Sequence, residues 1–172
     1  MKGRTMSVKR ILAIDLGASG GKCFAGVFDN GDFSMQEIHR FEHEGVSFYM
    51  PENNGKIVEK TYWNDTLIYS NIIEGLKVYR RNISDTVDSI GIDTWGADGC
   101  FISCNGEPLN RYYCYRDHRL DNMPEAVKEK ISPEEIYKLT GIVFQPFNLS
   151  CQLLWAAANR PGLFAQGNTF LP

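Results

Sequence analysis

The sequence has no long apolar run. The apolar segment that follows the basic start MKGRTMSVKR covers only residues 11–14, which is shorter than the roughly 7–15 residues of a signal-peptide core. Nothing in the chain approaches the roughly 20 apolar residues of a membrane span. We therefore expect a cytoplasmic protein that does not interact with a membrane.

The sequence also has no strong excess of charge of one sign. Its 18 basic and 21 acidic residues give a net charge of −3, so no basic surface predicts a nucleic-acid partner. A length of 172 residues favours one compact domain, with a second only if both are small.

Cysteines are few, and their number is odd. Five cysteines in a chain without a secretion signal favour reduced thiols. Cys100-x₃-Cys104 and Cys114-x₃-His118 could supply four zinc ligands, but the spacing is looser than the usual C-x₂-C. Because Cys100 and Cys104 share one strand face by period two, we expect no zinc.

The first half of the chain predicts a three-strand antiparallel meander. The strands are expected over residues 9–17, 22–29 and 33–41, with a hairpin at Asn30-Gly31-Asp32. MPENNGK, residues 50–56, is expected to be a surface loop. A helix is expected over 63–81, capped by Asn64 or Asp65.

The second half predicts one buried strand, a hairpin and helices. VDSIGIDTWG, residues 87–96, is expected to be the buried strand, and GCFISC and RYYCY the two arms of the hairpin. Helices are expected from Met123, from Ser132 to Gly141, and over 149–159, where Pro161-Gly162 ends the last one. This order describes an α/β domain.

The stretch LAIDLGASGGK, residues 12–22, resembles a phosphate-binding loop. It is not a Walker A loop, because Cys23 follows Gly21-Lys22 and Leu16 stands where the first glycine belongs. It is not a dinucleotide fingerprint, because Gly17 and Gly20 are three apart and a strand follows instead of a helix.

The remaining pattern suits the outer phosphates of a nucleotide. Glycines let backbone N–H groups approach an anion, a hydroxyl adds a donor and a lysine adds charge. These residues are Gly17, Gly20, Gly21, Ser19 and Lys22. Asp15 would repel phosphate unless a cation lay between them, so it implies Mg²⁺ held through water. The alternative is an ordinary hairpin with a glycine-rich turn and a surface lysine.

Trp95 and Asp98 follow directly after the apolar run of the strand expected over 87–96, where ligand sites gather in α/β sheets. A tryptophan plane suits a sugar face, and a carboxylate accepts hydroxyl hydrogen bonds. The alternative is a core tryptophan and a turn aspartate. Arg116, Asp117 and Arg119 could form a polar wall of the same site or a solvated, salt-bridged turn.

Five segments together resemble the FGGY carbohydrate kinases of the actin-like ATPase superfamily, and within them the rhamnulokinase branch. The segments are AIDLGASGGK at 13–22, EIHRF at 37–41, DSIGIDTWGAD at 88–98, YRDHR at 115–119 and IYKLTGIVFQPFN at 136–148. The resemblance implies an actin-like, RNase-H-like α/β fold whose mixed sheet opens with the meander and is flanked by helices. It also implies that residues 1–172 are a truncated N-terminal domain, since such proteins are about three times longer and bind ATP and sugar between two domains.

The resemblance assigns roles to particular residues. Asp15 matches the metal-associated aspartate, and Gly96 matches a sugar-contacting glycine flanked by Trp95 and Asp98. The ATP-phosphate loop matches Ala18, Ser19, Gly20, Gly21 and Lys22. Lysine replaces the family's usual arginine and loses its bidentate fork, and Gly99 stands where an aromatic residue is usual. The catalytic base belongs to the second domain, so no catalytic residue is assigned in this chain.

The resemblance implies ATP-dependent, Mg²⁺-dependent phosphorylation of a ketose hydroxyl, with L-rhamnulose as the favoured sugar. The partners would be sugar, ATP and the C-terminal domain of the same protein, and the isolated chain would be inactive. The alternative is a non-catalytic sugar- or nucleotide-binding module of the same fold. An RNase-H-like nuclease is disfavoured, because it would need several clustered carboxylates.

Overall fold

The computed structural model describes residues 8–52, 54–167 and 169–172. The chain divides into two compact units. The first takes the residues up to Glu44 together with Asn64–Trp95, and the second takes Gly45–Trp63 and Gly96–Pro172. Both are small, which is the condition under which the length of the chain allows a second unit.

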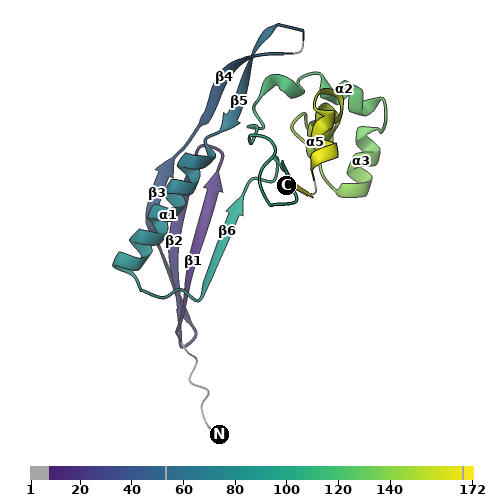
Figure 1. Cartoon of the computed structure of the whole chain (residues 1–172). Coiled ribbons are helices and arrows are strands. Elements are labelled where there is room, and N and C mark those ends of the chain that lie inside the picture. The colour runs from purple at the N-terminus through teal and green to yellow at the C-terminus, as the bar shows by residue number, and fades with distance from the viewer. Residues whose placement is uncertain (1–7, 53, 168) are drawn as a thin grey trace. The chain divides into compact units, whose positions relative to one another are not determined.

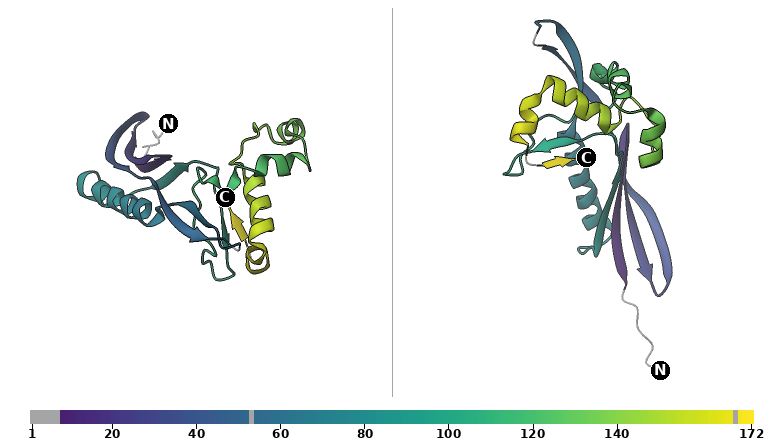
Figure 2. Two further views of the ribbon diagram at one scale, coloured as in Figure 1. Left: turned by 90° about the horizontal axis from the view of Figure 1, so that it is seen from above. Right: turned by 90° about the vertical axis from the view of Figure 1, so that its right-hand side faces the viewer.

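The first unit is a four-stranded mixed sheet with one helix (Figure 1). The strand order is β3-β2-β1-β6, in which β1, β2 and β3 form the expected antiparallel meander and β6 runs parallel to β1. The bounds are β1 Lys9–Gly17, β2 Gly20–Asp29, β3 Asp32–Glu42, β6 Ser89–Thr94 and α1 Asp65–Asn82. The helix lies along one face of the sheet, against β2 and β3 (Figure 2).

The core of the first unit follows the period-two pattern of its strands. Leu12 and Ile14 of β1 and Cys23 and Ala25 of β2 are buried, and Tyr79 of α1 packs against them. The expected Asn64 cap is confirmed, because its side chain accepts a hydrogen bond from the Leu67 N–H. The expected start at Trp63 is wrong, since Trp63 ends β5 and the helix begins at Asp65.

Two turns connect the meander, and they differ in backbone conformation. Asn30 and Gly31 both have positive φ, 50° and 100°, as a type I′ hairpin turn requires; the predicted hairpin is confirmed. Ala18 and Ser19, which join β1 to β2, are not among the positive-φ residues. The turn at 18–19 therefore does not depend on a left-handed residue.

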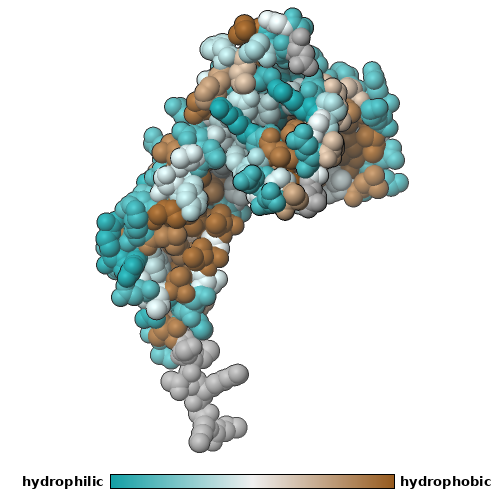
Figure 3. All heavy atoms as spheres, viewed as in Figure 1, coloured by the Kyte–Doolittle hydropathy of each residue, from teal (hydrophilic) through white to brown (hydrophobic). Residues whose placement is uncertain are grey.

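The segment predicted as a buried strand does form strand β6, but the strand is exposed. Its register places Ile90 beside Leu12 and Ile92 beside Ile14, yet Ile90 is 47% and Ile92 59% exposed. The reason is that β6 is an edge strand: among the described residues only β1 pairs with it. Figure 3 shows hydrophobic surface over this part of the sheet.

The second unit begins with a hairpin that the sequence analysis did not predict. Strands β4 (Gly45–Pro51) and β5 (Ile57–Trp63) pair antiparallel. The expected loop at 50–56 is the turn of this hairpin, except that Met50 and Pro51 belong to β4 and Asn53 lies outside the described residues.

The predicted hairpin of GCFISC with RYYCY is wrong. Strand β7 (Cys100–Ile102) pairs instead with β8 (Thr169–Leu171). The segment 111–115 runs beside β5, where Trp63 N–H donates to the Tyr112 carbonyl at 2.8 Å. The turn itself forms, because Leu109 N–H donates to the Phe101 carbonyl at 2.8 Å, but the chain then leaves β7.

Helices complete the second unit. The three predicted from sequence are confirmed as α2 Met123–Lys128, α3 Pro133–Thr140 and α4 Leu149–Asn159. Two were not predicted: η1 His118–Leu120 and α5 Pro161–Gln166, which begins at the Pro161-Gly162 pair that ends α4. Ser132 caps α3 by accepting from Glu135 N–H at 3.1 Å, and Gly141 ends that helix at φ 71°. Residues of β7, η1, α2 and α4 form the buried cluster: Phe101, Leu120, Val127, Cys151, Trp155 and Ala156. Within the described residues, no helix has the length and apolar character needed to cross a membrane.

Candidate functional site

The predicted site residues divide between the two units. Asp15, the segment 17–22 and Trp95 belong to the first unit. Gly96, Asp98, Arg116 and Asp117 belong to the second. The two groups are therefore described separately.

The predicted phosphate loop is the tight turn between β1 and β2. Ala18 and Ser19 form the turn, and Gly17 pairs with Gly20 directly below it. Two residues further from the turn, Asp15 lies opposite Lys22, so both side chains stand on the same face of the sheet. Asp15 is exposed and Lys22 is partly exposed, which leaves both side chains accessible to solvent.

Gly20 and Gly21 have a packing role in addition to the one expected from sequence. A Cβ on Gly20 would lie 2.6 Å from the Phe41 carbonyl oxygen, and a Cβ on Gly21 would overlap the Phe41 ring. These glycines therefore let β2 approach β3 closely, independently of any bound anion. Gly17 has no such constraint, since its nearest neighbour would be 3.4 Å away.

The parallel pairing of β1 with β6 brings a second carboxylate to this edge of the sheet. Asp93 lies opposite Asp15 in the register and is also exposed. The sequence analysis missed Asp93. The signal that could have found it is the repeated Ile-Asp at 14–15 and 92–93, once the two strands are taken as parallel neighbours.

His43, to which the sequence analysis gave no role, holds the turn from the β3 side. Its ring Nε2 donates to the Gly17 carbonyl at 2.9 Å, and its main-chain N–H donates to the Ser19 carbonyl at 3.1 Å. The residue is 4% exposed. Its ring lies 5.7 Å from the Trp95 ring and 6.2 Å from the Phe41 ring, between centroids. One buried side chain thus contacts both the predicted loop and the predicted sugar-binding tryptophan.

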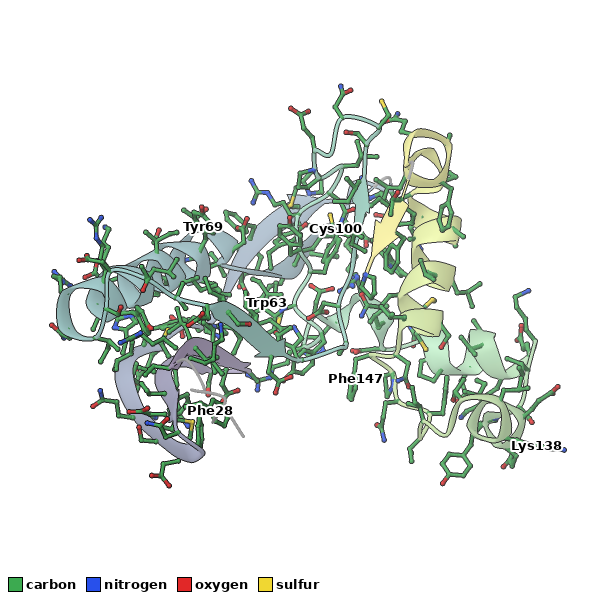
Figure 4. All side chains as sticks on the ribbon, turned by 90° about the horizontal axis from the view of Figure 1, so that it is seen from below. Phe28, Trp63, Tyr69, Cys100, Lys138 and Phe147 are labelled. Atoms are coloured by element: carbon green, nitrogen blue, oxygen red, sulfur yellow. The ribbon has the colours of Figure 1, made fainter. Side chains whose placement is uncertain are left out.

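In the second unit, Asp98 is fixed by an indole. Trp63 Nε1–H donates to Asp98 Oδ2 at 2.7 Å, and Trp63 is buried at the end of β5. Tyr115 lies 5.8 Å from Trp63 and 5.6 Å from Phe147, between ring centroids; Figure 4 labels Trp63 and Phe147. The aspartate therefore sits beside aromatic side chains. Gly96, two residues before it, has open space where a Cβ would lie.

Asp117 is buried, and its carboxylate accepts hydrogen bonds from within the protein. It is 3% exposed and accepts from Thr61 N–H at 2.7 Å, from Arg119 N–H at 3.0 Å and from Arg119 Nη1 at 3.3 Å. It caps η1 and anchors β5. This is neither a polar wall nor a solvated turn. Arg116 is exposed, with its guanidinium carbon 5.3 Å from the centre of the Tyr115 ring.

Arg119 and Gln152 connect this anchor to the predicted sugar-binding segment. Arg119 stacks 3.9 Å from the Tyr113 ring centre, and its Nη2 donates to Gln152 Oε1 at 2.9 Å. Burial lowers the pKa of Arg119, while the charge of Asp117 opposes that effect. Gln152 Nε2 donates in turn to the Ala97 carbonyl and, at 3.0 Å, to the Phe147 carbonyl.

Gln152 therefore fixes the main chain between Gly96 and Asp98. The sequence analysis did not identify it. The available signal is an amide on the buried face of α4, where Cys151 and Trp155 are apolar, because a buried amide needs hydrogen-bond partners.

The cysteines do not gather into a metal site in the part of the chain that the structure describes, where no cluster of three or more His, Cys, Asp or Glu ligands is found. Cys100 Sγ lies 3.4 Å from the Asn110 carbonyl oxygen. Cys104 is exposed, whereas Cys114 is buried.

Comparison with known families matches residues 10–172 to the FGGY family of carbohydrate kinases, N-terminal domain. The rhamnulokinase of Mannheimia succiniciproducens is 36% identical over 168 residues, which is 96% of this chain and 33% of that protein. The rhamnulokinase of Bacteroides thetaiotaomicron is 36% identical over 145 residues, 84% of this chain and 28% of that protein. The chain spans about a third of the length of the curated relatives it matches.

Solved structures share the fold at low sequence identity. A gluconate kinase from Lactobacillus acidophilus has a TM-score of 0.70 at 15% identity, covering 96% of this chain and 31% of that chain. A Plasmodium falciparum glycerol kinase with ADP has a TM-score of 0.66 at 21% identity, covering 92% and 30%. The fold is that of the actin-like sugar kinases, as the sequence resemblance implied.

Proposed function

Because the chain belongs to the FGGY family of carbohydrate kinases, we propose that the protein it is part of transfers the γ-phosphoryl group of ATP to a hydroxyl of L-rhamnulose. The observation that carries this proposal is the similarity to rhamnulokinases along nearly the whole chain. In the proposal, a second, C-terminal domain supplies the adenosine pocket and the catalytic base, and the chain described here is the N-terminal domain.

The β1–β2 turn is the proposed phosphate site. Main-chain N–H groups at the turn and the Ser19 hydroxyl would donate to the outer phosphates, and Lys22 would add a positive charge beside them. Phosphoryl transfer depends mainly on positioning and on charge stabilisation. A rigid turn with donors at fixed positions meets both requirements.

Asp15 is the proposed ligand of Mg²⁺, acting through water. The residues fit this ion, because Asp93 stands opposite Asp15 on β6 and carboxylate oxygens and water are the ligands that Mg²⁺ prefers. When bound, Mg²⁺ would neutralise charge on the phosphates. Asp15 then holds a cation between itself and an anion that it would otherwise repel.

The proposed sugar contacts of the second unit are Gly96, Asp98 and Arg116, and the proposed sugar contact of the first unit is Trp95. Gly96 leaves space for a ligand beside the main chain. Asp98 Oδ2 is oriented by Trp63, and Gln152 fixes the carbonyl between Gly96 and Asp98. Asp117 contributes indirectly in this proposal, by holding Arg119, which holds Gln152.

The test is a coupled ADP-release assay of the full-length protein with Mg-ATP and a panel of L-rhamnulose, xylulose, gluconate and glycerol. We expect turnover with L-rhamnulose at the highest kcat/KM. Lys22→Met should raise the KM for ATP, while Lys77→Met, on exposed α1, should not. Binding of sugar and nucleotide without turnover would establish the non-catalytic module instead.

A further inference from the structure

His43 donates two hydrogen bonds to one short turn. The imidazole Nε2–H donates to the Gly17 carbonyl, and the main-chain N–H donates to the Ser19 carbonyl. Because a carbonyl oxygen only accepts, Nε2 must carry a proton in this arrangement. The two bonded carbonyls flank the residues that the proposed function assigns to the phosphates.

The bond to the Gly17 carbonyl also sets the direction of the next N–H group. In a planar trans peptide the C=O of one residue and the N–H of the next point in opposite directions, and the described chain has no cis peptide bond. With the Gly17 carbonyl turned toward His43, the N–H group of Ala18 points away from it.

We propose that His43 is the positioning residue of the phosphate loop, an inference that rests on the proposed kinase function. By holding two carbonyl oxygens on the β3 side, it keeps their partial negative charges away from the nucleotide. By the bond to the Gly17 carbonyl it orients the Ala18 N–H for an anion. Its role is to place donors that are preorganised before ATP arrives, which lowers the cost of binding.

The His43 ring also packs against Trp95, so it can position that side chain as well as the loop. The imidazole lies 5.7 Å from the Trp95 ring and is itself packed near Phe41. A change at His43 should therefore alter both the phosphate loop and the last residue of the first unit. Both effects arise within one compact unit.

Three variants of the full-length protein test the inference. His43→Phe keeps a planar ring but removes the Nε2–H donor, while His43→Gln keeps an N–H at a similar reach. His39→Phe is the matched control. The His39 ring stacks on Phe41, at 5.8 Å between centroids, whereas the two hydrogen bonds to the Gly17 and Ser19 carbonyls both come from His43. The readouts are KM for Mg-ATP, KM for sugar, kcat and the thermal midpoint.

We expect His43→Phe to raise the KM for Mg-ATP about tenfold, consistent with loss of one buried hydrogen bond. His43→Gln should restore most of that loss, and His39→Phe should leave the KM for Mg-ATP unchanged even if its thermal midpoint falls. If His43→Phe has the wild-type KM, or if both Phe variants change KM equally, the inference is wrong while the kinase function stands.

A calorimetric titration with Mg-ATP separates this inference from the proposed function. If the wild-type protein shows no sugar-dependent ADP release, the proposed kinase function is wrong. Weaker Mg-ATP binding by His43→Phe than by wild type would still support the placement of the loop. Equal affinity, or no Mg-ATP binding by the wild type, would overturn it.

Discussion

The Thr61 N–H donates to Asp117 Oδ2 at 2.7 Å, joining the middle of β5 to the residue that caps η1. The Asp117 side chain is 1% exposed and is paired with Arg119, whose side chain is 6% exposed. Because the carboxylate accepts bonds from two segments of the second unit, its removal should loosen both.

We expect Asp117→Asn to lower the free energy of unfolding by about 3 kcal/mol or more, because it leaves the buried Arg119 guanidinium without its charge partner. Urea denaturation checks this. The control is Asp121→Asn, whose side chain is 64% exposed and which should change stability by less than about 0.5 kcal/mol. If the Asp117→Asn protein is as stable as the wild type but has a raised KM for sugar, Asp117 contacts the sugar and its structural role is wrong.

Asp15→Asn should abolish activity of the full-length protein while changing stability by less than about 1 kcal/mol. The physical reason is that Asp15 is exposed on its strand and is proposed to act on Mg²⁺. Asp32→Asn, at the far end of the meander, is the control for both readouts. Near-normal turnover of Asp15→Asn would remove this aspartate from the mechanism.

Gly20→Ala should destabilise the first unit by about 1–3 kcal/mol, the cost typical of overpacking. The new Cβ would meet the main-chain oxygen of Phe41 at 2.6 Å, which cannot rotate away as a side chain can. Gly91→Ala, where nothing lies within 4 Å of the Cβ, is the matched control in the same sheet. Equal thermal midpoints for the two variants would contradict the packing role of Gly20.

The five thiols should divide into one fast and four slow groups toward a thiol reagent in the native protein. Cys104 is exposed, whereas Cys23, Cys100, Cys114 and Cys151 are buried. Burial raises the pKa of each of these four, so less of the reactive thiolate is present. In denaturant all five should react, with no zinc by elemental analysis. One equivalent of zinc that survives dialysis against a weak chelator would contradict this.

The isolated 172-residue chain should fold but show no sugar-dependent ATP turnover. In the proposed function it lacks the catalytic base and the adenosine pocket, so we expect it to bind Mg-ATP no better than about millimolar. Calorimetric titration with Mg-ATP, with and without L-rhamnulose, checks this beside an ADP-release assay. Micromolar affinity or measurable turnover would mean that the chain alone holds a complete site.

The elements with strong local signals could be predicted from the sequence. Asn30-Gly31 requires a hairpin turn, and Ser132 with Gly141 marks both ends of α3, because these residues act through their immediate neighbours. The meander follows from period-two burial. The β7–β8 pairing could not be predicted in the same way, since it joins residues about 70 positions apart and no local feature specifies it.

The candidate site was predictable where a motif carries chemistry and not where tertiary contacts do. The glycine-rich turn predicted the position of the loop. His43 and Gln152 act on the main chain of other segments, so neither belongs to a motif. Asp117 was assigned to the ligand because its charge is visible in the sequence, whereas its burial is a property of the fold.

The order in which the two units occur along the chain has a consequence for synthesis on the ribosome. The β4–β5 hairpin is made after the meander, but its own unit continues only from Gly96. While residues 64–95 emerge, Trp63 and Tyr62 lack the partners that bury them later, such as Tyr112 and Tyr113. A nascent chain at that stage exposes an aromatic hairpin. Slowing translation between residues 64 and 111 should therefore increase its capture by chaperones.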